Sequence, residues 1–151
     1  MDKSELKVTA IKDGTVIDHI PANDLFKVVR ILNLENLDNQ ITVGVNLDSK
    51  KLGKKGIIKI SDKFFEDNEI NKIALLAPDA NLNIIKNYEV VEKRSVQLPD
   101  MICGISRCMN PKCITNSEPM ITKFEVVSKR PVALKCCYCE KITDAQHIVI
   151  E

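Results

Sequence analysis

Four cysteines near the C-terminal end limit the folds open to this chain more than any other residues do. Cys108 and Cys113 form one close pair, Cys136 and Cys139 form a second, and 22 residues separate the two pairs. Two pairs on turns, joined by a longer segment, have the spacing with which four thiolates surround one metal ion. We therefore predict a tetrahedral site with these four ligands, and we predict zinc because a redox-silent structural ion suits four thiolates.

Two alternatives to a zinc site stay open: iron held by the same thiolates, and four buried cysteines that bind nothing. Four thiolates leave no coordination position for water, so we expect the metal to stabilise the fold rather than to catalyse hydrolysis. Two further cysteines, Cys103 and Cys137, lie nearby in the sequence. We expect Cys103 to be a small apolar residue of a strand and Cys137 to point away from the neighbouring ligands. No catalytic residue is predicted.

The distribution of cysteines also divides the chain. All six lie after residue 102, in a segment of 54 residues (98–151) that is poor in aromatic residues. A segment of this size rarely folds by apolar burial alone and usually needs a metal or disulfides. The polar segment 92–99, which ends in Pro99, is the predicted linker. We therefore expect two domains, residues 1–97 and a small all-β zinc-binding domain over residues 98–151.

The periodicity of apolar residues predicts the elements of residues 1–97. In chain order we expect a hairpin (6–20), a helix opened by Pro21, two strands (40–47 and 56–60) around a basic loop (48–55), a helix (67–77) and a final strand pair (82–91). The order is ββαββαββ. With the helices on one face, it predicts a mixed α+β fold, a ferredoxin-like sandwich.

The charges of the chain nearly cancel, with 22 basic and 21 acidic residues and a formal net charge of +1. This balance argues against a protein that coats nucleic acid or an anionic membrane. No apolar run approaches the ~20 residues that span a bilayer. The first residues show no signal peptide. We expect a cytoplasmic protein that binds neither nucleic acid nor membranes.

Several segments resemble one protein family. The segments GTVIDHIP (14–21), ITVGVNL (41–47) and NYEVV (87–91) are similar to the regulatory chain of aspartate carbamoyltransferase, as are Ala77-Pro78 and Asn83. So is the cysteine quartet, which ends in LKCCYCEK. The quartet alone is shared with many zinc ribbons, but its combination with GTVIDHIP is much more specific. The resemblance covers nearly the whole chain, in order and with matching spacing.

The resemblance implies a non-catalytic subunit that modulates the first committed step of pyrimidine biosynthesis. In that family an N-terminal allosteric domain binds CTP, UTP or ATP, with or without Mg²⁺, and a zinc domain with one structural Zn²⁺ contacts the catalytic chains. The implied assembly has two catalytic trimers and three regulatory dimers. The nucleotide-binding positions that carry over by resemblance are Ala10, Ile11, Val16, Asp18, His19, Lys55, Lys59, Asn83, Ile85, Tyr88, Val90 and Lys93.

The chemistry of these residues suits a nucleoside triphosphate. Such a ligand carries about four negative charges, which Lys55, Lys59, Lys93 and a partly protonated His19 offset. Asp18 accepts hydrogen bonds from ribose hydroxyls, and backbone groups at strand edges read the base. No Walker-type glycine loop is present in the sequence, which fits binding without hydrolysis.

Two other functions fit parts of the sequence. A zinc-ribbon nucleic-acid-binding protein needs a basic zinc domain with exposed aromatic residues, but residues 98–151 hold seven basic and six acidic residues and only Phe124 and Tyr138 as aromatics. A thiol enzyme needs a base beside one cysteine, and the two histidines give it weak support.

Two residues depart from the family pattern: Thr9 and Lys51 stand at acidic positions and make the pocket more positive.

Overall fold

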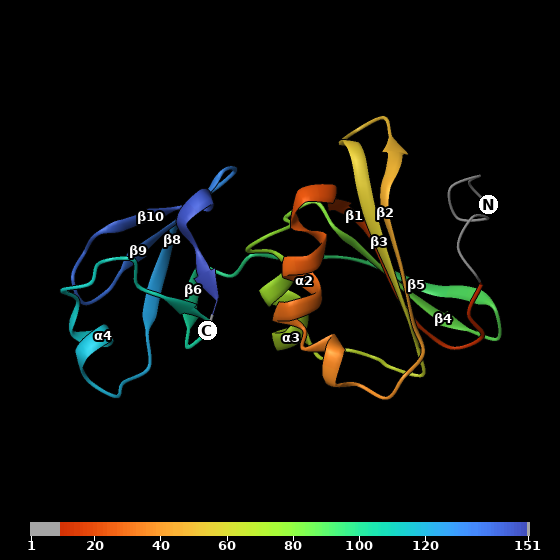
Figure 1. Ribbon diagram of the computed structural model, residues 1–151, viewed down its shortest axis with the longest axis horizontal. Helices are drawn as coiled ribbons and strands as arrows, with labels where there is room; N and C mark the ends of the chain where they lie inside the picture. The colour runs from red at the N-terminus through yellow and green to blue at the C-terminus, as the bar shows by residue number, and fades with distance from the viewer. Residues whose placement is uncertain (1–9, 151) are drawn as a thin grey trace. The chain divides into compact units, whose positions relative to one another are not determined.

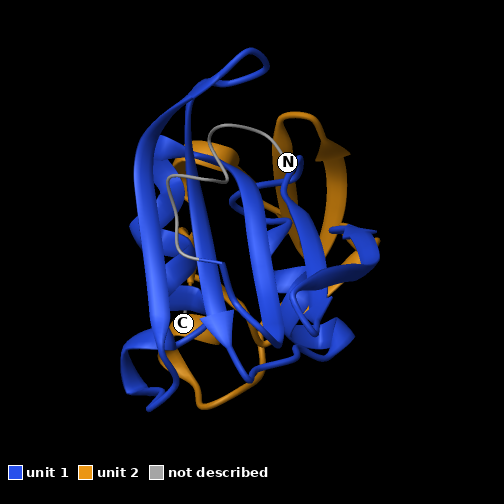
Figure 2. Ribbon diagram, turned by 90° about the vertical axis from the view of Figure 1, so that its right-hand side faces the viewer, with its two compact units in different colours: residues 1–97 blue, residues 98–151 orange. Residues whose placement is uncertain are grey.

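The computed structural model describes residues 10–150 of the chain (Figure 1). It divides into two units, an N-terminal unit (residues 1–97) and a C-terminal unit (residues 98–151), which Figure 2 distinguishes by colour. In the part of the chain that the structure describes, no helix is both long enough and apolar enough to cross a membrane.

The N-terminal unit alternates strands with short helices. Its elements in chain order are β1 (Gly14–Pro21), the 3₁₀ turn η1 (Ala22–Asp24), α2 (Leu25–Ile31), the 3₁₀ turn η2 (Leu34–Asn36), β2 (Ile41–Ser49), β3 (Gly53–Ser61), α3 (Asp67–Ile73), β4 (Asn81–Lys86) and β5 (Glu89–Ser95). The α-helices and strands among them correspond to the last seven of the eight predicted elements.

The five strands form one antiparallel sheet in the order β2-β3-β1-β4-β5. The first four of these, with helices after β1 and β3, have the ferredoxin-like arrangement, to which β5 adds an edge strand. Helices α2 and α3 lie together on one face of this sheet (Figure 1). The other face, which we call the open face, carries no helix of this unit's described residues. The predicted α+β class is confirmed.

Local sequence explains why these elements form. β1 contains the β-branched residues Thr15, Val16 and Ile17, which favour strands because they pack well on a pleated surface. Helix α3 begins with a capping box, in which the side chains of Glu66 and Glu69 each accept a hydrogen bond from the backbone N–H of the other residue. The cap therefore lies one residue before the start predicted from sequence.

β1 is the second half of the predicted hairpin, but its neighbours differ from the prediction. It pairs with β3 on one side and β4 on the other, so both of its edges are occupied. Residues 10–13 of the predicted first half are not a strand, and residues 6–9 lie outside the described residues. An alternating pattern next to a turn signal indicates a strand but does not say which strand will pair with it.

The predicted basic loop is mostly strand. β2 extends to Ser49 and β3 begins at Gly53, so the turn consists of residues 50–52. Gly53 has a φ of 77°, a conformation that favours glycine at the end of such a turn. Lys55 lies within β3 and is buried. A run of lysines usually marks a solvated segment, and it does not reveal that one of them has a buried partner.

The main core of the N-terminal unit lies between the sheet and its helices. Ile17 of β1 stands opposite Ile58 of β3 and Leu82 of β4, and all three side chains are fully buried. Leu25 of α2 and Ile73 of α3 are buried as completely. Burying each such side chain contributes about 1.5–3 kcal/mol, so this face of the sheet supplies most of the unit's stability.

The C-terminal unit is built from short strands. Its elements in chain order are β6 (Met101–Cys103), β7 (Ser106–Arg107), α4 (Ile114–Ser117), β8 (Lys123–Lys129), β9 (Val132–Cys136), β10 (Ile142–Asp144), the 3₁₀ turn η3 (Ala145–His147) and β11 (Val149–Ile150). The main sheet has the order β10-β9-β8-β6, and β11 pairs with β7. The unit is mostly sheet, as predicted, with one turn of helix, α4, that the all-β prediction did not include.

One buried row crosses this sheet and leads to a cysteine. Ile102 of β6 stands opposite Phe124 of β8, which stands opposite Cys136 of β9, and all three are buried. At the other sheet, Val149 of β11 pairs with Arg107, the residue before Cys108. The two sheets therefore position the chain directly at both cysteine pairs.

Candidate functional site

The four predicted metal ligands come together in the C-terminal unit. The Sγ atoms of Cys108 and Cys139 are 3.6 Å apart, and those of Cys113 and Cys136 are 3.7 Å apart. All four Sγ atoms lie within 4.8 Å of one another. A tetrahedron with metal–sulfur bonds of ~2.3 Å has edges of ~3.8 Å, so these thiols fit one metal ion of the size of zinc.

Backbone turns hold each pair of cysteines in place. In the first turn, the Cys113 N–H donates to the carbonyl of Asn110 at 3.0 Å, and the Lys112 N–H donates to the Asn110 side chain at 3.1 Å. In the second turn, the Cys136 N–H donates to the carbonyl of Lys141 at 3.0 Å. Within the folded unit, these contacts orient the four sulfur atoms toward one another.

Hydrogen bonds also reach the sulfur atoms. The Thr115 hydroxyl donates to Cys113 Sγ at 3.1 Å, and the Tyr138 N–H donates to Cys136 Sγ at 3.4 Å. Asn116 braces the first turn, because its Nδ2 donates to the carbonyls of Cys108 and Asn110 at 3.0 and 2.7 Å. Donors aimed at sulfur favour the thiolate, which is the form that binds metal.

The pKa values of the thiols differ with these surroundings. Burial raises the pKa of Cys108 to about 12. Burial also acts to raise the pKa of Cys139, but hydrogen bonds from the Lys141 backbone and the Asn110 side chain outweigh it and lower that pKa to about 7. For Cys113, the hydroxyl and N–H of Thr115 likewise outweigh burial and lower the pKa. Four thiolates this close repel one another, so full deprotonation needs a cation among them.

The two remaining cysteines stand apart from the cluster. Cys103 is exposed at the end of β6, and Cys137 is exposed between two of the ligands. Cys137 is thus not among the four thiols that the structure brings together, in line with the expectation that its side chain points away. The exposure of Cys103 differs from the apolar role expected for it, because β6 buries only its middle residue, Ile102.

A second candidate site lies on the open face of the N-terminal sheet. Four residues on adjacent strands stand opposite one another there: Lys59 on β3, Val16 on β1, Asn83 on β4 and Lys93 on β5. Residues opposite one another on neighbouring strands share a face and lie ~4.5–5.5 Å apart. One row across the sheet therefore carries two cations around an apolar and an amide side chain.

Two adjoining hollows in the open face share Asn83. The first is lined by Ala10, Ile11, Val16, Ile57, Lys59, Asn83, Ile85, Tyr88 and Val90. The second is lined by Asp18, His19, Asn81, Asn83, Lys93, Arg94 and Ser95. The first hollow is floored by a small apolar cluster, Val16, Ile57 and Ile85, whereas the second is polar.

The structure brings all twelve positions implied by the resemblance to this region. Eight of them line the first hollow, and Asp18, His19 and Lys93 join Asn83 in the second. Lys55 lines a further hollow with His19, beside the turn of the β2–β3 hairpin. An apolar recess beside a polar one with several cations can accept a flat ring and an attached anionic group.

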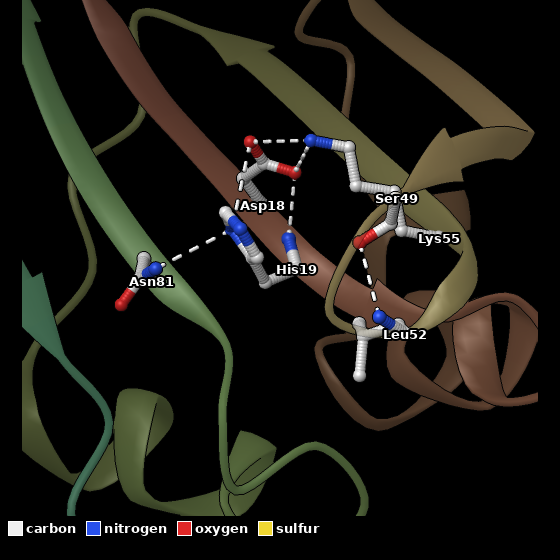
Figure 3. A network of polar contacts seen from close by, with 6 residues as sticks. All are labelled: Asp18, His19, Ser49, Leu52, Lys55 and Asn81. Carbon is white, nitrogen blue, oxygen red and sulfur yellow. Dashed lines mark hydrogen bonds and ion pairs between the residues drawn. The ribbon is translucent and has the colours of Figure 1, made fainter.

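A buried ion pair joins Asp18, which lines the second hollow, to Lys55, which lines the hollow beside the β2–β3 turn (Figure 3). The Lys55 ammonium is 3.0 Å from Asp18 Oδ1 and 3.2 Å from Oδ2, and both residues are about 5% exposed. Asp18 Oδ1 also accepts the backbone N–H of His19 at 2.6 Å. His19 has a φ of 61° at a bulge in β1, so this hydrogen bond stabilises an uncommon backbone conformation.

Sequence reasoning missed four residues that line the two main hollows: Ile57, Asn81, Arg94 and Ser95. Residues two positions apart on a strand share a face of the sheet, and this spacing was the available signal. Ile57 lies two residues from Lys59. Asn81 lies two residues from Asn83, and Ser95 lies two residues from Lys93. Arg94 differs, because it stands opposite the core residue Leu82 and forms an ion pair with Asp67 at the start of α3. Its guanidinium therefore lies beside the start of α3, although the residue also borders the second hollow.

Comparison with known families matches both units. Residues 6–97 match the family described as aspartate carbamoyltransferase regulatory chain, allosteric domain. Residues 100–149 match the family described as aspartate carbamoyltransferase regulatory chain, metal binding domain. The four-cysteine cluster lies within the second match.

Similar full-length proteins carry the same name. The aspartate carbamoyltransferase regulatory chain of Bacteroides fragilis is 58% identical over 149 residues, covering 99% of this chain and 97% of the relative. That of Thermococcus sibiricus is 54% identical over 145 residues, covering 96% of each. With family matches over both units and relatives this similar along nearly their whole length, the chain belongs to the family of regulatory, non-catalytic chains of aspartate carbamoyltransferase.

Proposed function

We propose that this chain is a cytoplasmic regulatory subunit that binds nucleoside triphosphates on the open face of its N-terminal unit and modulates the catalytic chains of aspartate carbamoyltransferase. The effectors are CTP, UTP and ATP, with or without Mg²⁺, and the regulated reaction is the first committed step of pyrimidine biosynthesis. The observation that carries the proposal is the meeting of twelve family positions, from residues 10 to 93, in adjoining hollows of one sheet face.

The first hollow suits the base of a nucleotide. Its floor is apolar, and its rim includes Ile11 and Tyr88. The backbone at Asn87 and Tyr88 has positive φ values of 52° and 67°, and the Tyr88 N–H donates to the carbonyl of Lys12 at 2.9 Å. A turn held in this way presents fixed backbone donors and acceptors, which can distinguish one base edge from another.

The second hollow suits the phosphates. Lys93 and His19 line it, and Lys59 lies in the same cross-strand row as Lys93. A triphosphate carries about four negative charges, which lysine and imidazole donors offset. Asp18 also lines this hollow, but its carboxylate is paired with the Lys55 ammonium. The charge of Lys55 therefore reduces the repulsion between this carboxylate and the phosphates.

We further propose zinc as the metal of the C-terminal unit, one ion per chain, held by Cys108, Cys113, Cys136 and Cys139. Support comes from the donor set, since four thiolates favour a tetrahedral, redox-silent ion. The bound ion supplies folding free energy, and the chain's own Thr115 and Asn116 orient the ligands around it.

The C-terminal unit is also the proposed contact with the catalytic chains. Three large apolar side chains beside the cysteine turns, Met109, Ile114 and Tyr138, are about half exposed. Exposed apolar groups around a rigid metal site suit a protein interface.

Pairing of the regulatory chains into dimers is proposed through an outer strand of the N-terminal sheet, where β2 exposes Val43 and Val45. The assembly then contains two catalytic trimers and three regulatory dimers.

Isothermal titration of the full chain with CTP, UTP and ATP tests the effector site. We expect binding at millimolar concentration or better, and about tenfold weaker binding in Lys93→Gln because one charged hydrogen bond to phosphate is lost. Lys72→Gln is the matched control: it removes one positive charge from the last turn of α3, on the helix-covered side of the sheet, and Lys72 lines none of the three hollows. Equal losses in the two variants, or no binding by wild type, contradict the proposed site.

A further inference from the structure

A polar side chain from another strand lies close to the ring of His19. Asn81 of β4 stands directly opposite Asp18 in the sheet register, and its Nδ2 lies 3.4 Å from His19 Nδ1 (Figure 3). The backbone of His19 is held separately, by the bulge in β1 and by the hydrogen bond from its N–H to Asp18. Asn81 therefore acts on the imidazole itself and not on the chain that carries it.

The contact between Asn81 Nδ2 and His19 Nδ1 suits one tautomer of the neutral ring. Nδ2 is a donor only, so Nδ1 must accept, and the proton of a neutral imidazole then lies on Nε2. The competing partner for a proton on Nδ1 is Asp18 Oδ2, at 3.7 Å. Oδ2 already receives Lys55 at 3.2 Å and lies farther from Nδ1 than Asn81 Nδ2 does, while Oδ1 receives Lys55 at 3.0 Å and the His19 N–H at 2.6 Å.

We propose that Asn81 is a positioning residue for effector binding: it holds neutral His19 in the tautomer with a proton on Nε2, so that the ring presents a donor to a phosphate oxygen. The inference rests on the proposed function, because the phosphate is that of a nucleoside triphosphate. With the proton on Nδ1 instead, an Nε2 lone pair faces the phosphate oxygens, and the hydrogen bond is replaced by repulsion between acceptors.

Charged groups from several elements surround this ring. Asp18 of β1, Lys55 of β3 and Lys93 of β5 line the same hollows as His19, and Asp48, Lys50 and Lys51 line the hollow beside the β2–β3 turn. Lys93 and Arg94 line the second hollow together with His19, whereas Lys50, Lys51 and Lys55 line the hollow beside the turn, so in the second hollow the imidazole joins two cationic side chains. The direction of the imidazole proton therefore matters to binding there.

Nitrogen-15 NMR of the histidine rings in the effector-free protein tests the tautomer directly, at a pH well above the ordinary titration range of histidine. We expect the spectrum of His19 to show a protonated Nε2. In Asn81→Asp the new carboxylate accepts from Nδ1, and we expect the proton to move there. Ser95→Ala, in the same hollow and opposite Asn81 on β5, should leave the tautomer unchanged. His147, in the other unit, is an internal reference.

Titration with CTP then tests whether the tautomer acts on binding. We expect Asn81→Ala to weaken binding about tenfold, the loss of one hydrogen bond to a charged group. The same change in a His19→Asn background should have no further effect, because Asn81 acts through the ring and asparagine tolerates the left-handed backbone. A protonated Nδ1 in wild type, or equal losses in both backgrounds, overturns this inference. Absence of CTP binding by wild type overturns the proposed function, while the tautomer measurement still decides the Asn81–His19 contact.

Discussion

The two units of the chain are stabilised by different means. Of the twelve largest side chains that are fully buried among the described residues, nine lie in the N-terminal unit. The other three, Ile102, Phe124 and Leu134, lie in the C-terminal unit. The N-terminal unit closes a sheet face with helices, whereas the C-terminal unit places a few apolar residues beside four thiols. We expect the first to depend on apolar burial and the second to depend on a metal.

This difference explains where each unit can carry function. Because the apolar core of the N-terminal sheet lies on its helix-covered face, the open face can hold the buried charges Asp18, Lys55 and Lys59 without interrupting that core. In the C-terminal unit the buried row of side chains leads to a metal-ligand cysteine, so we expect its stability and its proposed contact with the catalytic chains to depend on the same site. The proposed effector site and the proposed metal-dependent contact therefore lie in separate units.

Removal of the metal should have the largest effect and should separate the two units. We expect a chelator, or Cys136→Ser, to unfold the C-terminal unit, because metal binding supplies about 10–16 kcal/mol in comparable four-ligand sites. The N-terminal unit should stay folded, and contact with the catalytic chains should be lost. Two-dimensional ¹H–¹⁵N NMR spectra, recorded with a measurement of metal content, follow both units in one sample.

The matched control for this experiment is Cys137→Ser, which changes an exposed thiol between two ligands. It should keep the metal and the dispersed resonances of both units. Dispersed C-terminal resonances after verified loss of the metal would contradict the proposed dependence. Collapse of both units together would show that their stabilities are not separate.

The buried ion pair is the second largest expected effect, and it tests whether apolar burial alone accounts for the N-terminal unit. Lys55→Met leaves the Asp18 carboxylate buried without its partner, which costs about 3–5 kcal/mol. Lys54→Met is the control, since Lys54 pairs with Asp48 at the surface and such pairs contribute about 0–1 kcal/mol. Urea unfolding followed by circular dichroism measures both. Recovery of stability on adding Asp18→Asn to Lys55→Met would identify the unpaired charge as the cause.

A cavity in the apolar core is the third expected effect. Ile17→Ala removes a fully buried side chain from the centre of the sheet and should destabilise the N-terminal unit by about 3 kcal/mol. Val91→Ala, at an exposed site on the edge strand β5, should change stability by less than about 0.5 kcal/mol. Metal affinity should be the same in both variants. A fall in metal affinity with Ile17→Ala would mean that the two units are not stabilised independently.

Features with a local signature could be predicted from the sequence. The spacing of Cys108, Cys113, Cys136 and Cys139 predicted a cluster that the structure contains, because short turns fix where each pair of sulfurs lies. The order of strands and helices followed from periodicity, and it was enough to identify the ferredoxin-like sheet. The predicted effector positions depended on the resemblance, since Asp18 and His19 by themselves indicate only a surface pair at the end of a strand.

Contacts between distant segments could not be predicted from the residues alone. The pairing of β1 with β3 and β4 is decided by packing of the whole sheet, and no local pattern distinguishes it from a hairpin with the preceding residues. Burial of Lys55 depends on a carboxylate 37 positions away, and the contact of Asn81 with His19 spans 62 positions. Such pairs become visible only when the strand register is known.

The smallest expected effect concerns the hydrogen bonds around the metal ligands. Thr115→Val keeps the shape of the side chain but removes the hydroxyl that donates to Cys113 Sγ at 3.1 Å. Without this donor the pKa of Cys113, which Thr115 lowers against the effect of burial, rises, and we expect metal affinity to fall about tenfold. Competition with a chromophoric chelator measures the change. Ser117→Ala, in the same helix α4 with its hydroxyl on the Ile114 carbonyl and away from the thiols, should keep the wild-type affinity. If Thr115→Val and wild type bind metal equally, the hydrogen bond from Thr115 contributes nothing to metal affinity, and the four thiolates alone determine it. If affinity falls as expected, hydrogen bonds to the ligands add to the stability that the metal gives to this unit, just as apolar burial gives stability to the N-terminal unit.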